Sequence, residues 1–243
     1  MTDRSLGLSP NPTARMAGFL YLITIVAGVF AQFYVGSALI VRNDAAATAS
    51  HILASEALYR LGLAAELVGI LAYVGVTALL YVLLRPVNRT LSVLAACFSL
   101  VGCAVGTVKL AFHGAPLFLL GGAHYSAGFT PDQMQALAYT FLKLEVQANN
   151  LGLICFGFYC SLIGWLVIRS TFFPRLLGVT MGIGGLCWLV NGFAILLAPA
   201  LAAQIYPIIA AGILGEGSLC LGLMLAGVNT AKWRAQASAT AEA

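Results

Sequence analysis

Long uninterrupted runs of apolar residues are the main pattern along this chain. Six stretches of about 20 residues or more are nearly free of charge, which is the length that an α-helix needs to cross the hydrocarbon core of a bilayer. They run from about Met16 to Val41, Leu61 to Leu84, Leu91 to between Ala111 and Leu120, Asn150 to Ile168, Leu176 to Leu197, and Tyr206 to Val228. The pattern therefore predicts an all-α fold, a polytopic membrane helix bundle with six transmembrane helices.

The segments between these runs also carry information. Residues 85–89 and 169–175 are short basic connections, whereas residues 42–60 and 121–149 are longer and contain acidic groups. Residues 45–59 within the first long segment look helical, and the last connection, about residues 198–204, is uncharged and is read as a loop.

The second long segment contains a helix start. Thr130 suits the N-cap, Pro131 suits the first helical position, and Gln133 completes a capping box. The fourth helix is therefore predicted to begin near Pro131, before the apolar run.

The distribution of basic residues predicts an orientation. Eight of the 12 lysines and arginines fall on one side of a six-helix arrangement and four fall on or near the other side. The eight are Arg4, Arg15, Arg85, Arg89, Arg169, Arg175, Lys232 and Arg234, and the four are Arg42, Arg60, Lys109 and Lys143. Because basic loops stay cytoplasmic, both termini are expected in the cytoplasm. The predicted parts are an N-terminal cytoplasmic tail (1–13), a transmembrane domain (14–230) and a C-terminal cytoplasmic tail (231–243).

Composition excludes a soluble domain. The chain is 61% hydrophobic and 8% charged, with a mean hydropathy of +0.96, whereas soluble domains are about a quarter charged. Lipid must therefore solvate it, and the net charge of +4 indicates no nucleic-acid partner. The first apolar run is too long for a cleaved signal peptide, so we expect it to remain as the first span of a multi-pass protein of the cytoplasmic membrane.

Five polar residues within the apolar runs are the candidates for binding a ligand or a proton: Glu66, Lys109, His113, Asn191 and Glu216. At a rise of about 1.5 Å per residue, they lie at or beyond the membrane midplane, on the side away from the termini. Helical spacing puts the charged ones on glycine-containing faces, which suit close helix packing. The sequence thus predicts an outward-facing polar pocket, because ionisable groups at such depth mark functional sites.

Each candidate also has a structural interpretation. Lys109 is close enough to the outer surface to extend its ammonium into water, and Glu66 could pair with Lys109 or Arg60 for structure alone. Asn191 could form a hydrogen bond between helices. Whether Lys109 pairs with Glu66 or with Glu216 stays open. Glu216 is central and lies between two glycines, which favours a direct function.

No motif indicates a cofactor, a metal or catalytic residues. The three histidines, His51, His113 and His124, share no ligand spacing. The six cysteines all lie in apolar runs without a metal-binding pair, which is typical of small buried side chains. No G-x-S-x-G motif is present. No P-loop lysine follows Gly178 and Gly182, so this pair is better interpreted as helix packing than as phosphate binding.

Several stretches resemble a known family. Residues 164–178, GWLVIRSTFFPRLLG, are similar to the G-Y-L-I-x-R-S-x-x-x-P-R-x-L-G signature of the bacterial domain-of-unknown-function 4386 family. Residues 15–22, 60–62, 81–91, 129–137 and 215–219 also fit its pattern. The resemblance covers about Arg15 to Val228 and implies a six-helix membrane domain without an assigned activity. This chain departs from the pattern at Ser99, where many members have arginine, and at Glu145, where many have histidine.

Three functions follow as hypotheses. The first is binding or transport of a small solute or a proton through the polar pocket. The second is an intramembrane enzyme acting on a lipid or quinone, with His113, Glu145 and Glu216 as acid and base; without a nucleophile or cofactor motif, it ranks lower. The third is an assembly or regulatory subunit of a membrane complex. Besides the bilayer, the possible partners are a small solute, a lipid ligand, a second copy or another subunit.

Overall fold

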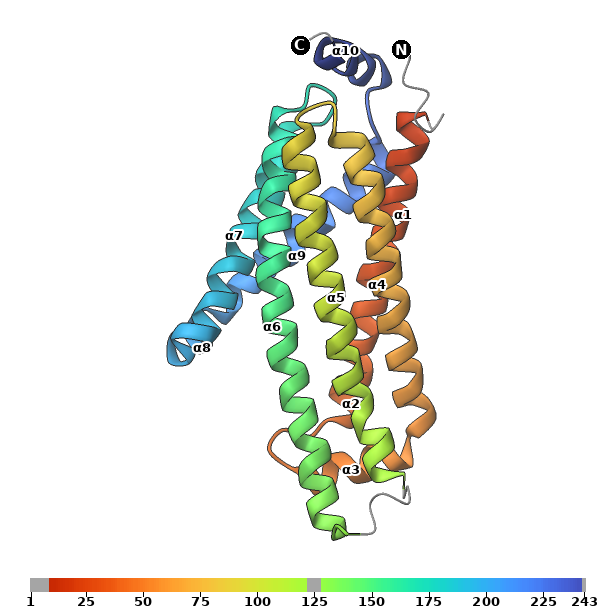
Figure 1. The fold of residues 1–243 in the computed structure, drawn as a ribbon, viewed down its shortest axis with the longest axis vertical. Coiled ribbons are helices and arrows are strands. Elements are labelled where there is room, and N and C mark those ends of the chain that lie inside the picture. Colours follow the sequence, from red (N-terminus) through yellow and green to blue (C-terminus); the bar gives the residue numbers. More distant parts are fainter. Residues whose placement is uncertain (1–8, 122–127, 242–243) are drawn as a thin grey trace. The chain divides into compact units, whose positions relative to one another are not determined.

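A computed structural model describes residues 9–121 and 128–241, and their regular secondary structure is helical throughout (Figure 1). The helices before the second long connection are α1 (Pro10–Val29), the π-helix η1 (Phe30–Gly36), α2 (Ser37–Leu39), α3 (Ala45–Ala54), α4 (Glu56–Leu84) and α5 (Arg89–Leu120). Those after it are α6 (Pro131–Arg169), α7 (Arg175–Leu197), α8 (Pro199–Ile205), the 3₁₀-helix η3 (Tyr206–Ile208), α9 (Ile209–Leu221), the π-helix η4 (Gly222–Ala226) and α10 (Thr230–Ala241).

The predicted number of membrane-spanning helices is confirmed for the described part of the chain. Six helical segments are long and apolar enough to cross a bilayer: Pro10–Leu39, Glu56–Leu84, Arg89–Leu120, Pro131–Arg169, Arg175–Leu197 and Ile209–Ala226. The protein is therefore all-α and multi-pass. The cytoplasmic placement of both termini stays a prediction.

The predicted start of the fourth spanning helix is also confirmed. The Thr130 backbone N–H donates to Gln133 Oε1 at 2.9 Å, and the Gln133 backbone N–H donates to Thr130 Oγ1 at 3.3 Å. These reciprocal bonds satisfy two backbone donors that a helix start otherwise leaves free. As a result, α6 extends well beyond the apolar run.

Three segments are more helical than the sequence pattern predicted. α1 begins at Pro10, inside the predicted N-terminal tail, and α8 replaces the predicted loop before the last span. Proline at Pro10 and Pro199 suits the first turn of a helix because no N–H bond is lost there. The C-terminal tail forms α10, where Asn229 Oδ1 accepts from the Lys232 N–H at 3.1 Å.

The chain divides into two compact units, and four of the long helices contribute segments to both. Unit 1 comprises residues 1–22, 73–102 and 153–243, and unit 2 comprises residues 23–72 and 103–152.

Glycines set the packing of unit 1. A side chain at Gly164 on α6 would place its Cβ 2.5 Å from the Gly182 nitrogen and 2.7 Å from the Gly178 carbonyl oxygen of α7. On the other side of α7, a Cβ at Gly215 of α9 would lie 2.7 Å from the Thr180 carbonyl oxygen. α7 therefore lies backbone to backbone against both neighbours, as small residues allow in membranes. The prediction that Gly178 serves helix packing is confirmed.

Unit 2 has a compact apolar core around a short helix. The buried residues of this core are Val35, Leu39, Ile52, Tyr59 and Leu142. α3 supplies Ile52, and its first turn is capped by Asp44, whose Oδ1 accepts from the Ala47 N–H at 2.8 Å. The long connection before α4 is thus an ordered part of unit 2.

We predict that Gly164→Ala destabilises the protein by about 1–3 kcal/mol, because its new methyl group would meet backbone that cannot move aside without separating α6 from α7. The matched control is Gly182→Ala on the facing helix, where a Cβ meets nothing within 4 Å. Thermal unfolding in detergent, followed by helical circular dichroism, measures both. Equal midpoints for the two variants would contradict this account of α6–α7 packing.

Candidate functional site

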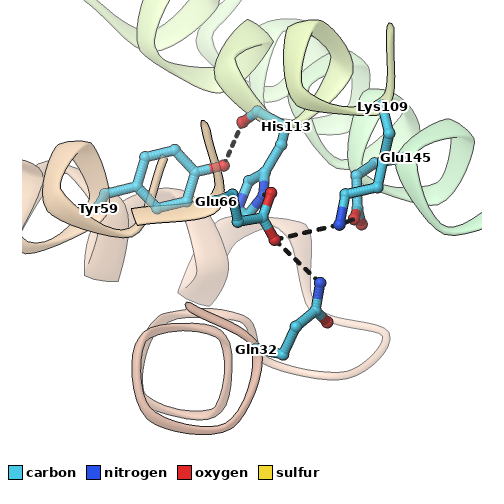
Figure 2. A network of polar contacts seen from close by, with 6 residues as sticks. All are labelled: Gln32, Tyr59, Glu66, Lys109, His113 and Glu145. Atoms are coloured by element: carbon cyan, nitrogen blue, oxygen red, sulfur yellow. Dashed lines mark hydrogen bonds and ion pairs between the residues drawn. The ribbon is translucent and has the colours of Figure 1, made fainter. Parts of the chain in front are cut away.

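A buried network of charged groups lies in unit 2, and the Lys109 ammonium of α5 is at its centre (Figure 2). Lys109 Nζ lies 3.1 Å from Glu66 Oε1 of α4 and 3.4 Å from Glu145 Oε1 of α6. One ammonium therefore bridges carboxylates from two different helices. Charge-assisted contacts between an ammonium and a carboxylate are stronger than hydrogen bonds between neutral groups.

Glu66 has two further partners. Gln32, in the π-helix η1, donates from Nε2 to Glu66 Oε1 at 3.0 Å. His113 Nδ1 lies 3.3 Å from the other oxygen, Glu66 Oε2. Irregular helix turns of the η1 type occur often at functional sites. The Glu66 carboxylate thus has at least three polar partners.

Helical spacing on α5 aligns two of these groups. Lys109 and His113 are four residues apart, so they share one face of the helix. Tyr59 holds His113 in place. Its hydroxyl donates to the His113 carbonyl oxygen, and its ring contacts the imidazole edge-on, with centroids 5.1 Å apart. Tyr59 is itself 1% exposed, so this support belongs to the apolar core of unit 2.

The network is buried, and its positive and negative charges do not balance. Glu66, Lys109, His113 and Glu145 are each 8% exposed or less. Two carboxylates face one ammonium, so the four residues carry one net negative charge when the imidazole is neutral and none when it is protonated. In a low-dielectric interior such an imbalance is costly. The arrangement can therefore accept one more positive charge.

Three of these residues could in principle hold a metal ion. Glu66, His113 and Glu145 each offer one ligand atom, and these atoms lie within 4.8 Å of one another. Carboxylate and imidazole are common ligands of divalent metals. However, the Lys109 ammonium contacts both carboxylates, so it already provides the positive charge that a metal would bring. We therefore describe the group as an ion-pair network.

The other two predicted site residues, Glu216 and Asn191, lie in unit 1. Glu216 Oε2 accepts from the Tyr21 hydroxyl at 2.8 Å, and its Oε1 accepts from Trp188 Nε1 at 3.0 Å. Asn191 is 1% exposed, and neither polar atom of its side chain has a hydrogen-bond partner among the described residues. The five candidates thus fall into two groups, one in each unit. A single pocket lined by all five stays a prediction.

Two structural interpretations of the candidates can now be decided. Lys109 is buried and paired, so the expectation that its ammonium extends into water is wrong. Its partners are Glu66 and Glu145, and Glu216 is not among them. Arg60 pairs with Glu56 at 2.7 Å, so it does not hold Glu66.

Sequence reasoning left Glu145 and Gln32 out of the predicted polar pocket, and it named Glu145 only in the enzyme hypothesis and as a departure from the family pattern. It did not single out the aromatic partners Tyr59, Tyr21 and Trp188. A signal for Glu145 was present. The buried positions of α6 before it are Met134, Ala138 and Leu142, so a carboxylate continues an otherwise apolar helical stripe. Of the other two histidines, His51 is exposed on α3, and His124 lies outside the described residues.

Six apolar helices with a buried charge network define the class of this molecule as a multi-pass membrane protein. A family model described as a domain of unknown function (DUF4386) matches residues 16–227, which is most of the chain. The chain belongs to this family, as the resemblance implied. The two departures from the family pattern are both buried here: Ser99 shares a hydrogen bond with Thr77, and Glu145 pairs with Lys109.

A protein of Archaeoglobus fulgidus described as an uncharacterized protein is similar to part of this chain. The two are 29% identical over 123 residues, which covers 40% of this chain and 76% of that protein. No solved structure matches the chain.

We predict that Lys109→Met destabilises the protein by about 3–5 kcal/mol, because it leaves two buried carboxylates without their shared cation. Lys143→Met, an exposed lysine of α6 that lies 4.9 Å from the centre of the Tyr139 ring, is the matched control and should change stability by no more than about 0.5 kcal/mol. Unfolding by denaturant in mixed micelles measures the difference. If the two variants were equally stable, Lys109 would not be structurally required.

Proposed function

We propose that this protein binds and transports a proton or a small solute across the membrane, and that the network around Lys109 is the site at which the transported species exchanges. The observation that carries the proposal is the shared ammonium: Lys109 lies within 3.4 Å of two carboxylates from separate helices. Ionisable groups within membrane-spanning helices are costly and commonly mark transport paths.

The composition of the network supports exchange over a purely structural role. A structural ion pair needs one carboxylate for each ammonium, but here a second carboxylate and an imidazole are added. A cation that binds one carboxylate leaves Lys109 with the other, so the ammonium keeps a partner in both states. Occupied and empty states of this kind would differ little in electrostatic cost, which a transport cycle requires.

The polarity of the chain gives the proposed path a direction. With both termini in the cytoplasm, Lys109 lies about 27 Å along its span from Leu91 at a rise of about 1.5 Å per residue. On this predicted orientation, the network would lie in the outer half of the bilayer. The network would then exchange more readily with the outside, and we propose the cytoplasmic membrane as its location.

Proton movement can be measured in liposomes that contain the purified protein and a pH-sensitive dye. After an acid pulse, we predict that wild-type protein dissipates the pH gradient faster than protein-free liposomes do. Glu66→Gln should reduce the rate to that of protein-free liposomes, because it removes the carboxylate that contacts both Lys109 and His113. Glu56→Gln, which breaks only the exposed pair with Arg60, should retain the wild-type rate.

Two results bear on the proposal as a whole. If the Glu66→Gln protein is monodisperse and still dissipates the gradient at the wild-type rate, the network is not the path. If wild-type liposomes match protein-free ones for protons, the same liposomes are tested with a panel of radiolabelled amino acids, sugars and organic ions. A lack of uptake above the protein-free control for all of them would contradict transport.

A further inference from the structure

The second polar group, around Glu216 in unit 1, has a property that the Lys109 network lacks. Both Glu216 oxygens accept hydrogen bonds, but the donors are neutral: the Tyr21 hydroxyl and the Trp188 indole. None of the ion pairs between described residues involves Glu216, whereas Glu66 and Glu145 each have a cationic partner. A carboxylate in a membrane-spanning helix is thus held in place without a counter-charge, which is costly unless it binds a cation or a proton.

Aromatic side chains lie next to this carboxylate. Besides Tyr21 and Trp188, the Tyr73 ring lies edge-on to Tyr21 with centroids 5.4 Å apart, and the two hydroxyl oxygens are 3.4 Å apart. Tyr73 in turn meets Phe156 at 4.9 Å and Tyr159 at 5.8 Å. Tyr21 and Trp188 turn their polar edges to the carboxylate, and the Tyr73 hydroxyl lies next to that of Tyr21. A carboxylate with phenol oxygens beside it offers several acceptors to the N–H groups of an ammonium ion.

A bare metal ion fits this site less well. Among the described residues, no second carboxylate, imidazole or thiolate completes a three-ligand group with Glu216. Divalent metals bound by proteins take four or more ligands, most of them charged or imidazole. One carboxylate with aromatic neighbours therefore favours a single positive charge on an organic ion.

Asn191 adds an independent observation. It follows Trp188 by three residues on α7, so the two side chains lie on the same face about one turn apart. Its amide is 1% exposed and has no hydrogen-bond partner among the described residues. An unpaired buried amide destabilises the fold, and an ammonium N–H would satisfy its oxygen. A quaternary ammonium group has no N–H and could not.

The approach to Glu216 is not closed by its own helix. Gly217 follows it on α9, and a Cβ at Gly217 would meet nothing within 4 Å. Glu216 itself is half-buried, while the Trp188 side of the site is closed because a Cβ at Gly212 would lie 2.4 Å from the indole. α9 is therefore open at the residue that follows Glu216 and closed by the indole one turn before it.

The geometry points to a binding site for a small primary ammonium ion at Glu216. The carboxylate binds the charge, Tyr21 and Trp188 hold the carboxylate, Tyr73 adds a hydroxyl acceptor, and Asn191 accepts an N–H. This site is separate from the Lys109 network and does not depend on transport by that network.

Trp188 provides a direct probe of the site. The chain has three tryptophans, so the double variant Trp165→Phe/Trp233→Phe leaves Trp188 as its sole indole fluorophore. We predict a saturable change in its fluorescence on titration with methylammonium chloride, relative to sodium chloride at the same ionic strength. Tetramethylammonium should bind at least about tenfold more weakly, the equivalent of about 1.4 kcal/mol, because it cannot donate to Asn191.

Two further variants in the single-tryptophan background test the assignment. Glu216→Gln should abolish the methylammonium response, and Asn191→Leu should reduce the preference for methylammonium over tetramethylammonium. Stabilisation of the wild-type protein against heat by methylammonium is measured in parallel, so the test does not depend on the folding of any variant. A response identical to that with sodium chloride, together with no thermal stabilisation, would show that Glu216 holds a proton only and would overturn the proposal.

Discussion

The structure of unit 2 depends on one electrostatic constraint: a lysine ammonium, 8% exposed, shared by carboxylates from two other helices. A charge buried alone among apolar helices is prohibitively costly, so Lys109 fixes the positions of Glu66 and Glu145 together. Segments of α4, α5 and α6 are thereby joined at one point, and Gln32 adds a contact from η1. The hydrogen bond from the Tyr59 hydroxyl to the His113 carbonyl oxygen supports the same part of unit 2.

Unit 1 is held together by a different kind of interaction. Its helices meet through glycines, so that backbone atoms of α6, α7 and α9 come into contact without intervening side chains. Lipid offers no hydrophobic drive for helices to associate, and such close packing takes its place. The polar group of this unit is correspondingly neutral in its contacts, since Glu216 is held by a phenol and an indole. The two units therefore present two different chemistries, one with paired charges and one with an unpaired carboxylate.

Much of this arrangement could be predicted from the sequence, for physical reasons. A helix needs about 20 apolar residues to span the hydrocarbon core, so the six helices could be predicted from the apolar runs in the sequence. The capping box at Thr130 and Gln133 was visible because its chemistry is local. The partner of Lys109 could not be predicted, because the three candidate carboxylates, Glu66, Glu145 and Glu216, all lie on other helices. Helical spacing does not show which face of one helix contacts which face of another. Tyr21 and Trp188 went unnoticed because aromatic residues in apolar helices are ordinary core residues unless a carboxylate is known to lie beside them.

The central claim is that Lys109 compensates two carboxylates at once, and a double-mutant cycle between Lys109→Met and Glu145→Gln tests it most directly. With Lys109 present, Glu145→Gln should lower the free energy of unfolding, because it removes an ion pair. With Met at this position, the same change should be neutral or stabilising, because it removes one of two unpaired charges. The account predicts a coupling of about 1–3 kcal/mol between the two sites. An equal effect of Glu145→Gln in both backgrounds would contradict it.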